Sequence, residues 1–179
     1  MKQQLINKLT DKSAIIGIIG LGYVGIPLAL RYAEAGYKVV GFDIDPEKVE
    51  RISSGKTYIK HIPDEDIQSA VNRGFEATID FTRAMDADAL ILCVPTPLDR
   101  HREPDLSYVL DTMDSLLPYL RKGHVVSLES TTYPGTTDEE LNPRFESTGL
   151  NVGDDAFLVY SPERDDPGHS TFNTHTHPK

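Results

Sequence analysis

The segment GLGYVG at residues 20–25 constrains the fold of this chain more than any other feature. It directly follows residues 14–19, a β-branched run without charge that predicts a strand buried on both faces. A helical pattern then continues to about residue 35, where Gly36 predicts its end. A strand, a glycine turn and a helix in immediate succession predict the first unit of a parallel α/β sheet.

Each glycine of this segment has a separate role in the binding of a dinucleotide. Gly20 permits the tight turn, Gly22 lets the backbone approach a pyrophosphate, and Gly25 lets the helix pack closely on the strand. The helix that starts here presents backbone N–H groups, including those of Tyr23 and Val24, and partial positive charge to phosphates. The alternative is a glycine-rich turn without a ligand, against which the next acidic residue argues.

Asp43 ends a second predicted strand, residues 38–42, and lies 23 residues after the first glycine of the segment. A carboxylate at this place hydrogen-bonds the hydroxyls of an adenosine ribose, and it would repel a 2′-phosphate. The pattern therefore favours NAD over NADP. Asp45 competes for this role, but its place before Pro46 fits a helix N-cap better. Lys48 either contacts the ribose or is a solvated helix lysine.

Strand-like and helix-like segments alternate along the rest of the chain. They predict a single α/β domain with a Rossmann-like, doubly wound parallel sheet of six strands. The other strands are predicted at residues 75–79, 89–94, 124–128 and 156–160. This domain is expected to span residues 14–160, between a helical N-terminal extension at 1–13 and an active-site loop at 161–179.

Capping residues predict where the helices begin. One short helix should follow Asp45, and another should cover residues 64–73 before Gly74. Asp105 is expected to be the N-cap of a long amphipathic helix, and Thr137 with Glu140 fits a capping box.

Composition excludes several classes of partner. The formal charge of −10, from 28 acidic and 18 basic residues, argues against nucleic acid or an anionic membrane as a partner. No apolar run reaches the roughly 20 residues that span a bilayer. The single cysteine, Cys93, excludes an intrachain disulfide, and with a start unlike a signal peptide it favours a cytoplasmic location. His175 and His177 are expected to belong to a solvated tail, and no metal site is predicted.

Three further segments come just after predicted strands, at the sheet edge where α/β proteins bind ligands. They are VPTP at residues 94–97, ESTTYPGTT at 129–137 and SPER at 161–164. Together with GLGYVGIPLA and GFDID, they resemble the UDP-glucose/GDP-mannose dehydrogenase family over essentially the whole chain. REPD at 102–105 and SLESTTYPGTT look most like the branch that acts on UDP-N-acetylglucosamine.

The resemblance implies an enzyme that oxidises the C6 hydroxyl of a UDP-sugar to a carboxylate with two NAD. It further implies that Val94, Pro95, Thr96 and Thr131 line the nicotinamide region, and that Thr131 and Glu163 take part in catalysis. Turn and cap chemistry is the alternative for both threonines, and a surface ion pair is the alternative for Glu163.

The family's nucleophilic cysteine and a lysine that assists it belong, by the same resemblance, to a later domain outside these 179 residues. Cys93 lies within the apolar run ALILCV and is expected to be a small buried hydrophobe, not the nucleophile. These residues alone are therefore expected to be inactive, and the full-length protein to be a homo-oligomer. A Rossmann dehydrogenase of another alcohol and a non-catalytic NAD-binding module remain the alternatives.

Overall fold

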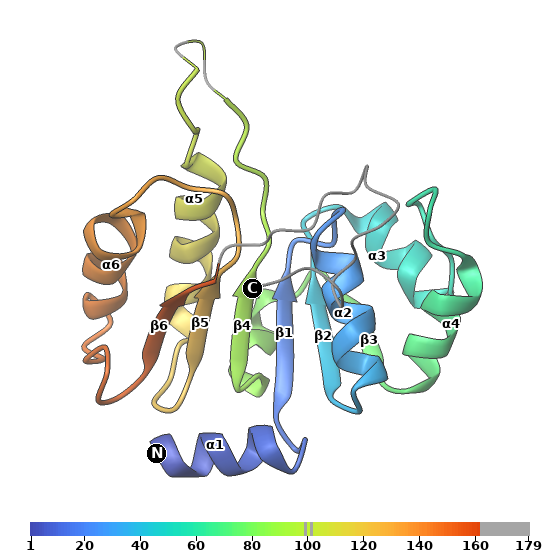
Figure 1. The fold of residues 1–179 in the computed structure, drawn as a ribbon, viewed down its shortest axis with the longest axis horizontal. Helices are drawn as coiled ribbons and strands as arrows, with labels where there is room; N and C mark the ends of the chain where they lie inside the picture. Colours follow the sequence, from blue (N-terminus) through green and yellow to red (C-terminus); the bar gives the residue numbers. More distant parts are fainter. Residues whose placement is uncertain (99, 101, 162–179) are drawn as a thin grey trace.

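The computed structural model describes residues 1–98, 100 and 102–161 (Figure 1). Glu163, His175 and His177 lie outside the described residues. All six predicted strands are present, and all of their pairings are parallel. They form one sheet in the order β3-β2-β1-β4-β5-β6, which is the doubly wound Rossmann order and confirms the predicted fold class. The strands are β1 (Ile15–Ile19), β2 (Lys38–Phe42), β3 (Phe75–Thr78), β4 (Ala89–Leu92), β5 (Val125–Leu128) and β6 (Phe157–Tyr160).

Helices connect these strands and cover the sheet. The α-helices are α1 (Lys2–Thr10), α2 (Gly25–Glu34), α3 (Pro46–Ser53), α4 (Asp64–Asn72), α5 (Ser107–Leu116) and α6 (Asn142–Glu146). The described residues also form two 3₁₀ segments, Phe81–Asp86 and Leu117–Tyr119, and a π-helical segment, Thr136–Leu141. No helix among the described residues is long and apolar enough to cross a membrane.

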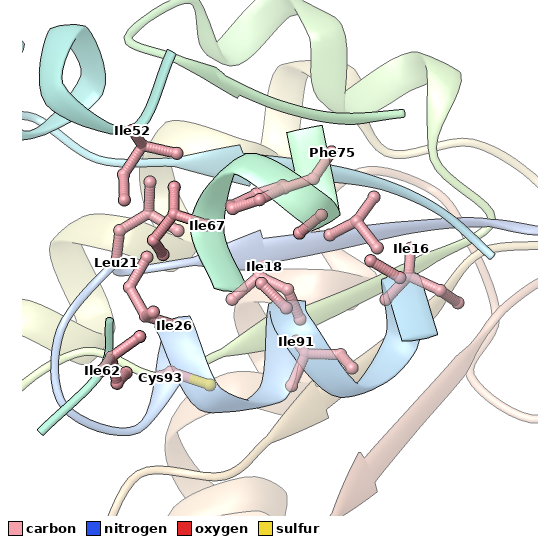
Figure 2. Close-up of a cluster of buried hydrophobic side chains, with 14 of the residues drawn as sticks. Ile16, Ile18, Leu21, Ile26, Ile52, Ile62, Ile67, Phe75, Ile91 and Cys93 are labelled. Carbon is pink, nitrogen blue, oxygen red and sulfur yellow. The ribbon is translucent and has the colours of Figure 1, made fainter. Parts of the chain in front are cut away.

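The sheet separates two apolar cores, because successive residues of a strand point to opposite faces. In β4, Ala89 and Ile91 join the core on the α2 and α4 face, whereas Leu90 and Leu92 join the core on the α5 and α6 face. Figure 2 shows the first of these cores. With both faces of its central strands covered, β4 is buried throughout, as a continuous apolar run requires.

α1 lies across the sheet edge opposite to the carboxyl ends of the strands (Figure 1). The Lys8 ammonium pairs with the buried Asp88 carboxylate at 2.8 Å, and the Tyr37 hydroxyl donates to the Leu9 carbonyl at 2.7 Å. The extension expected at residues 1–13 is therefore helical over most of its length and attached to the domain by polar bonds.

Two predicted helix starts are wrong in their details. α5 begins after Leu106, and Asp105 lies one residue before the N-cap, where it accepts a hydrogen bond from the Ser107 N–H at 2.9 Å. The capping box predicted Thr137 as an N-cap, but the N-cap is Gly135, two residues earlier, where the chain turns in a left-handed conformation. The Asp45 N-cap is confirmed, since its carboxylate accepts from the Glu47 N–H at 2.9 Å.

Candidate functional site

A cleft of about 530 Å³ opens at the carboxyl ends of β1, β2, β4 and β5. In doubly wound sheets a ligand binds at this edge, where the order of the strands reverses. Ten of the eleven residues expected to bind the cofactor line the cleft. They are Gly20, Gly22, Tyr23, Val24, Asp43, Lys48, Val94, Pro95, Thr96 and Thr131.

The eleventh residue, Gly25, lies beneath the turn. Its surroundings show how closely the turn packs against the start of the helix. A Cβ atom on Gly25 would lie 1.8 Å from the Gly20 carbonyl oxygen, so no other residue fits there. Gly20 itself has a φ of +94°, and a Cβ on it would lie 2.7 Å from the Cys93 carbonyl oxygen. Both glycines are therefore required by close backbone packing, as the sequence predicts.

Gly22 differs from the other two glycines because no atom lies within 4 Å of the place where its Cβ would be. Within the described part of the chain, the backbone N–H groups of residues 22–25 have no hydrogen-bond partner. α2 begins at Gly25, and its positive end faces the same cleft. Unpaired N–H groups, a helix N-terminus and open space above Gly22 suit a pyrophosphate.

Asp43 is buried, and its carboxylate ties two loops together. One oxygen accepts from the Leu21 N–H at 2.9 Å, and the other accepts from the Asp45 N–H at 3.0 Å. The Lys48 ammonium lies 3.4 Å from the first oxygen. Since a carboxylate accepts about four hydrogen bonds, Asp43 keeps acceptor capacity for a hydroxyl in the cleft that it lines.

Thr96 and Thr131 lie at the end of the cleft formed by the loops that follow β4 and β5. Neither hydroxyl bonds to another described residue, so neither makes the turn or cap bond that would explain it structurally. The neighbouring Ser130 instead joins the two loops, donating to the Val94 carbonyl at 2.8 Å.

Sequence reasoning missed five residues that line the cleft. Cys93, Glu129 and Ser130 belong to segments already identified. Their position at the ends of predicted strands could have identified them as residues that line the cleft. Cys93 is buried beneath the turn, with 8% of its surface exposed. Tyr58 and Ile59 come from the α3–α4 connection, where no motif marks them.

Tyr58 is held at the floor of the cleft. Its hydroxyl donates to the Leu21 carbonyl. Burial, together with the negative charges of Asp43 and Asp45, raises the pKa of this hydroxyl above its ordinary value. Tyr58 therefore remains a protonated donor well into the alkaline range.

At the mouth of the cleft the exposed Tyr23 ring stacks on His61, with centroids 6.2 Å apart.

A comparison with known families gives the context of this cleft. Residues 14–179 match the sequence profile described as the UDP-glucose/GDP-mannose dehydrogenase family, NAD binding domain. The chain belongs to this family. The match covers the glycine turn, Asp43 and both threonines, and it confirms the resemblance and the NAD cofactor expected from the sequence.

Individual members of the family are similar to this chain in sequence, and one solved structure is similar in fold. The chain is 35% identical over 158 residues to UDP-N-acetyl-D-glucosamine 6-dehydrogenase of Pseudomonas aeruginosa, and the matched region covers 88% of this chain and 37% of that one. It is 37% identical over 167 residues to UDP-N-acetyl-D-mannosamine dehydrogenase of Escherichia coli, covering 87% and 38%. The crystal structure of NDP-N-acetyl-D-galactosaminuronic acid dehydrogenase from Methanosarcina mazei superposes with a TM-score of 0.80 at 34% identity, covering 90% and 37%.

The chain thus spans less than two fifths of the length of these relatives. The names of the relatives include more than one amino sugar.

The described residues contain no group of three or more His, Cys, Asp or Glu side chains that could hold a metal ion.

Proposed function

We propose that this chain is the NAD-binding part of an enzyme that oxidises the C6 hydroxyl of a UDP-N-acetylhexosamine, in the first place UDP-N-acetylglucosamine, to a carboxylate with two NAD. One observation carries the proposal: a single cleft joins the glycine turn, Asp43 and the two threonines at the end of the sheet. A dehydrogenase needs such a cleft, because it must hold a long dinucleotide and place its reactive end beside a substrate.

The cleft offers a different chemistry to each part of the cofactor. Gly22 and the start of α2 would bind the pyrophosphate, and Asp43 with Lys48 would bind the adenosine ribose. Val94, Pro95, Thr96 and Thr131 would then line the nicotinamide region at the opposite end. Bound NAD would supply the hydride acceptor, and the residues of this chain would hold that acceptor in place.

Residues of the catalytic step are proposed by the family resemblance. The Thr131 hydroxyl would hold a water or the reacting sugar oxygen, and Glu163 would act as the carboxylate that assists hydrolysis. The nucleophilic cysteine would come from a part of the enzyme beyond these residues, as would most contacts to the sugar. A homo-oligomer and a cytoplasmic location are proposed on the same basis.

Titration calorimetry with NAD and NADP tests the cofactor assignment. The chain should bind NAD, and NADP should bind at least tenfold more weakly, because its 2′-phosphate would approach the Asp43 carboxylate. Asp43→Asn should reduce this difference. Equal or tighter binding of NADP to the unaltered chain would remove Asp43 from the ribose site.

The substrate is tested on a chain extended to the full length of the relatives. NADH formation should be faster with UDP-N-acetylglucosamine than with UDP-N-acetylmannosamine or UDP-glucose. Turnover with a different alcohol alone would support another Rossmann dehydrogenase, and NAD binding without any turnover would support a non-catalytic module. In that enzyme Glu163→Gln should lower turnover about 100-fold, the size of a lost general base, and leave NAD affinity unchanged within a few-fold.

A further inference from the structure

Leu21, the residue between the first two glycines of the turn, is held at three points. Its N–H donates to Asp43 at 2.9 Å, and its carbonyl accepts from the Tyr58 hydroxyl. Its side chain is fully buried against β2, where a Cβ on Gly41 would lie 2.6 Å from a Leu21 methyl carbon. Figure 2 shows Leu21 in the apolar core beside Ile26 and Ile67. The turn therefore has little freedom to rotate about this residue.

The bond from Tyr58 has a consequence for the next residue, Gly22. A peptide unit is planar and trans, so a carbonyl held in one direction fixes the N–H of the same unit in the opposite direction. The carbonyl of Leu21 and the N–H of Gly22 belong to one unit. This N–H has no partner among the described residues, and Gly22 lines the cleft.

Tyr58 is itself well placed to hold this carbonyl. The Asp64 carboxylate accepts from the backbone N–H of the preceding residue, Thr57, at 2.8 Å. The following residue, Ile59, is buried in the core. The connection between α3 and α4 thus fixes a hydroxyl donor against a turn that is 37 residues away in the sequence.

We infer that Tyr58 is a positioning residue, whose hydroxyl orients the Leu21–Gly22 peptide so that the Gly22 N–H is ready to bind a pyrophosphate oxygen. The inference rests on the proposed function, since it assumes that the cleft holds NAD. A donor fixed in advance avoids the loss of freedom that a mobile loop would suffer on binding. The hydroxyl acts through the backbone and need not touch the cofactor.

Tyr58→Phe keeps the ring in the cleft and removes only the hydroxyl. We expect it to weaken the binding of NAD and of inorganic pyrophosphate about tenfold, the effect of one misplaced hydrogen bond. Adenosine, which has no phosphate, should bind with unchanged affinity. Affinities for all three ligands can be measured by titration of the ¹⁵N-labelled chain followed by NMR.

Tyr37→Phe is a matched control, because it removes a tyrosine-to-carbonyl bond of the same kind at the opposite edge of the sheet. It should leave the three affinities unchanged. Equal weakening of all three ligands by Tyr58→Phe would indicate a general structural role and overturn the inference. Unchanged affinities in Tyr58→Phe would also overturn it.

The unaltered chain provides a second test that does not depend on the folding of a variant. Pyrophosphate should shift the Gly22 amide resonance strongly and the Leu21 amide resonance little, because Asp43 already holds the latter. A Gly22 resonance that does not respond overturns the inference while the proposed function stands. A chain that binds neither NAD nor pyrophosphate overturns the proposed function and the inference together.

Discussion

At the scale of single residues, the glycines of the turn differ in what surrounds them. Gly25→Ala should destabilise the domain by at least about 3 kcal/mol, because its methyl group would collide with the backbone oxygen of Gly20. Gly22→Ala should change the free energy of unfolding by less than about 0.5 kcal/mol, because its methyl group enters open space. The same change should weaken NAD binding at least tenfold, since the methyl group occupies the place of the pyrophosphate.

Urea unfolding and NAD titration of both variants check this prediction. Unchanged NAD affinity in Gly22→Ala would show that the pyrophosphate binds elsewhere. A fully stable Gly25→Ala variant would contradict the close contact of turn and helix.

His124 should make the stability of the domain depend on pH. The side chain is fully buried, and its Nε2 has no partner among the described residues. Burial, aided by the positive charge of Arg121, lowers the pKa of His124 from 6.5 to about 4. Between these values the unfolded chain binds a proton that the folded chain does not bind, so stability should decrease as the pH falls from 6.5 to 4. The loss should be about 2–3 kcal/mol.

Comparison with His124→Asn isolates this effect. Asn retains an acceptor for the Arg121 N–H, which bonds to Nδ1 of His124 at 3.2 Å, and it does not titrate. The difference between the two unfolding free energies should therefore shrink or reverse across this pH range. Carboxylates with a lowered pKa, such as Asp88, lose their stabilising contribution only as the pH falls below about 3.8, which is outside this range. Parallel pH profiles for both proteins would show that His124 is not responsible.

At the scale of elements, Asp88 joins three parts of the fold at the edge opposite to the cleft. Its carboxylate accepts from Lys8 of α1 at 2.8 Å, from the Ile15 N–H of β1 at 3.1 Å and from Arg121 at 3.4 Å. Burial alone would raise the pKa of Asp88, but the bonds from Lys8 and Ile15 lower it overall. Asp88 is therefore ionised and shared by a helix, a strand and a loop.

Asp88→Ala should cost about 3 kcal/mol of stability, because it leaves the part-buried Ile15 N–H without its acceptor and removes the carboxylate that faces Lys8 and Arg121. Lys8→Met should cost no more than about 1 kcal/mol, because the lysine side chain is half exposed and its apolar stem is retained. Urea unfolding of both variants measures the two costs. Equal costs would mean that α1 and Asp88 contribute mainly through the ion pair.

At the scale of the whole molecule, the chain should bind NAD without turning over a UDP-sugar. Cys93 is the one cysteine of the sequence, and its side chain is only 8% exposed and packs in the apolar core on the α2 and α4 face, as a small hydrophobe does. NADH absorbance should stay flat with UDP-N-acetylglucosamine and UDP-glucose. Sustained turnover that Cys93→Ser abolishes would show that this thiol is the nucleophile.

Local sequence patterns predict the helices and strands and the sheet edge where the site residues meet. The six strands, the Asp45 cap and the roles of Gly20 and Gly25 follow from local patterns, because an apolar run, a cap or a left-handed glycine is set by neighbours in the chain. Parallel strands then bring their carboxyl ends to one edge. For this reason residues from separate segments, such as Asp43 and Thr131, could be assigned to one site.

The contacts that hold the site in place follow only from the folded structure. Nothing near Tyr58 in the sequence shows that its hydroxyl meets the Leu21 carbonyl, and the same holds for Lys8 and Asp88, which are 80 residues apart. Such bonds depend on how loops close over a packed core, and a local pattern carries no information about a partner that only the folded chain brings within 3 Å.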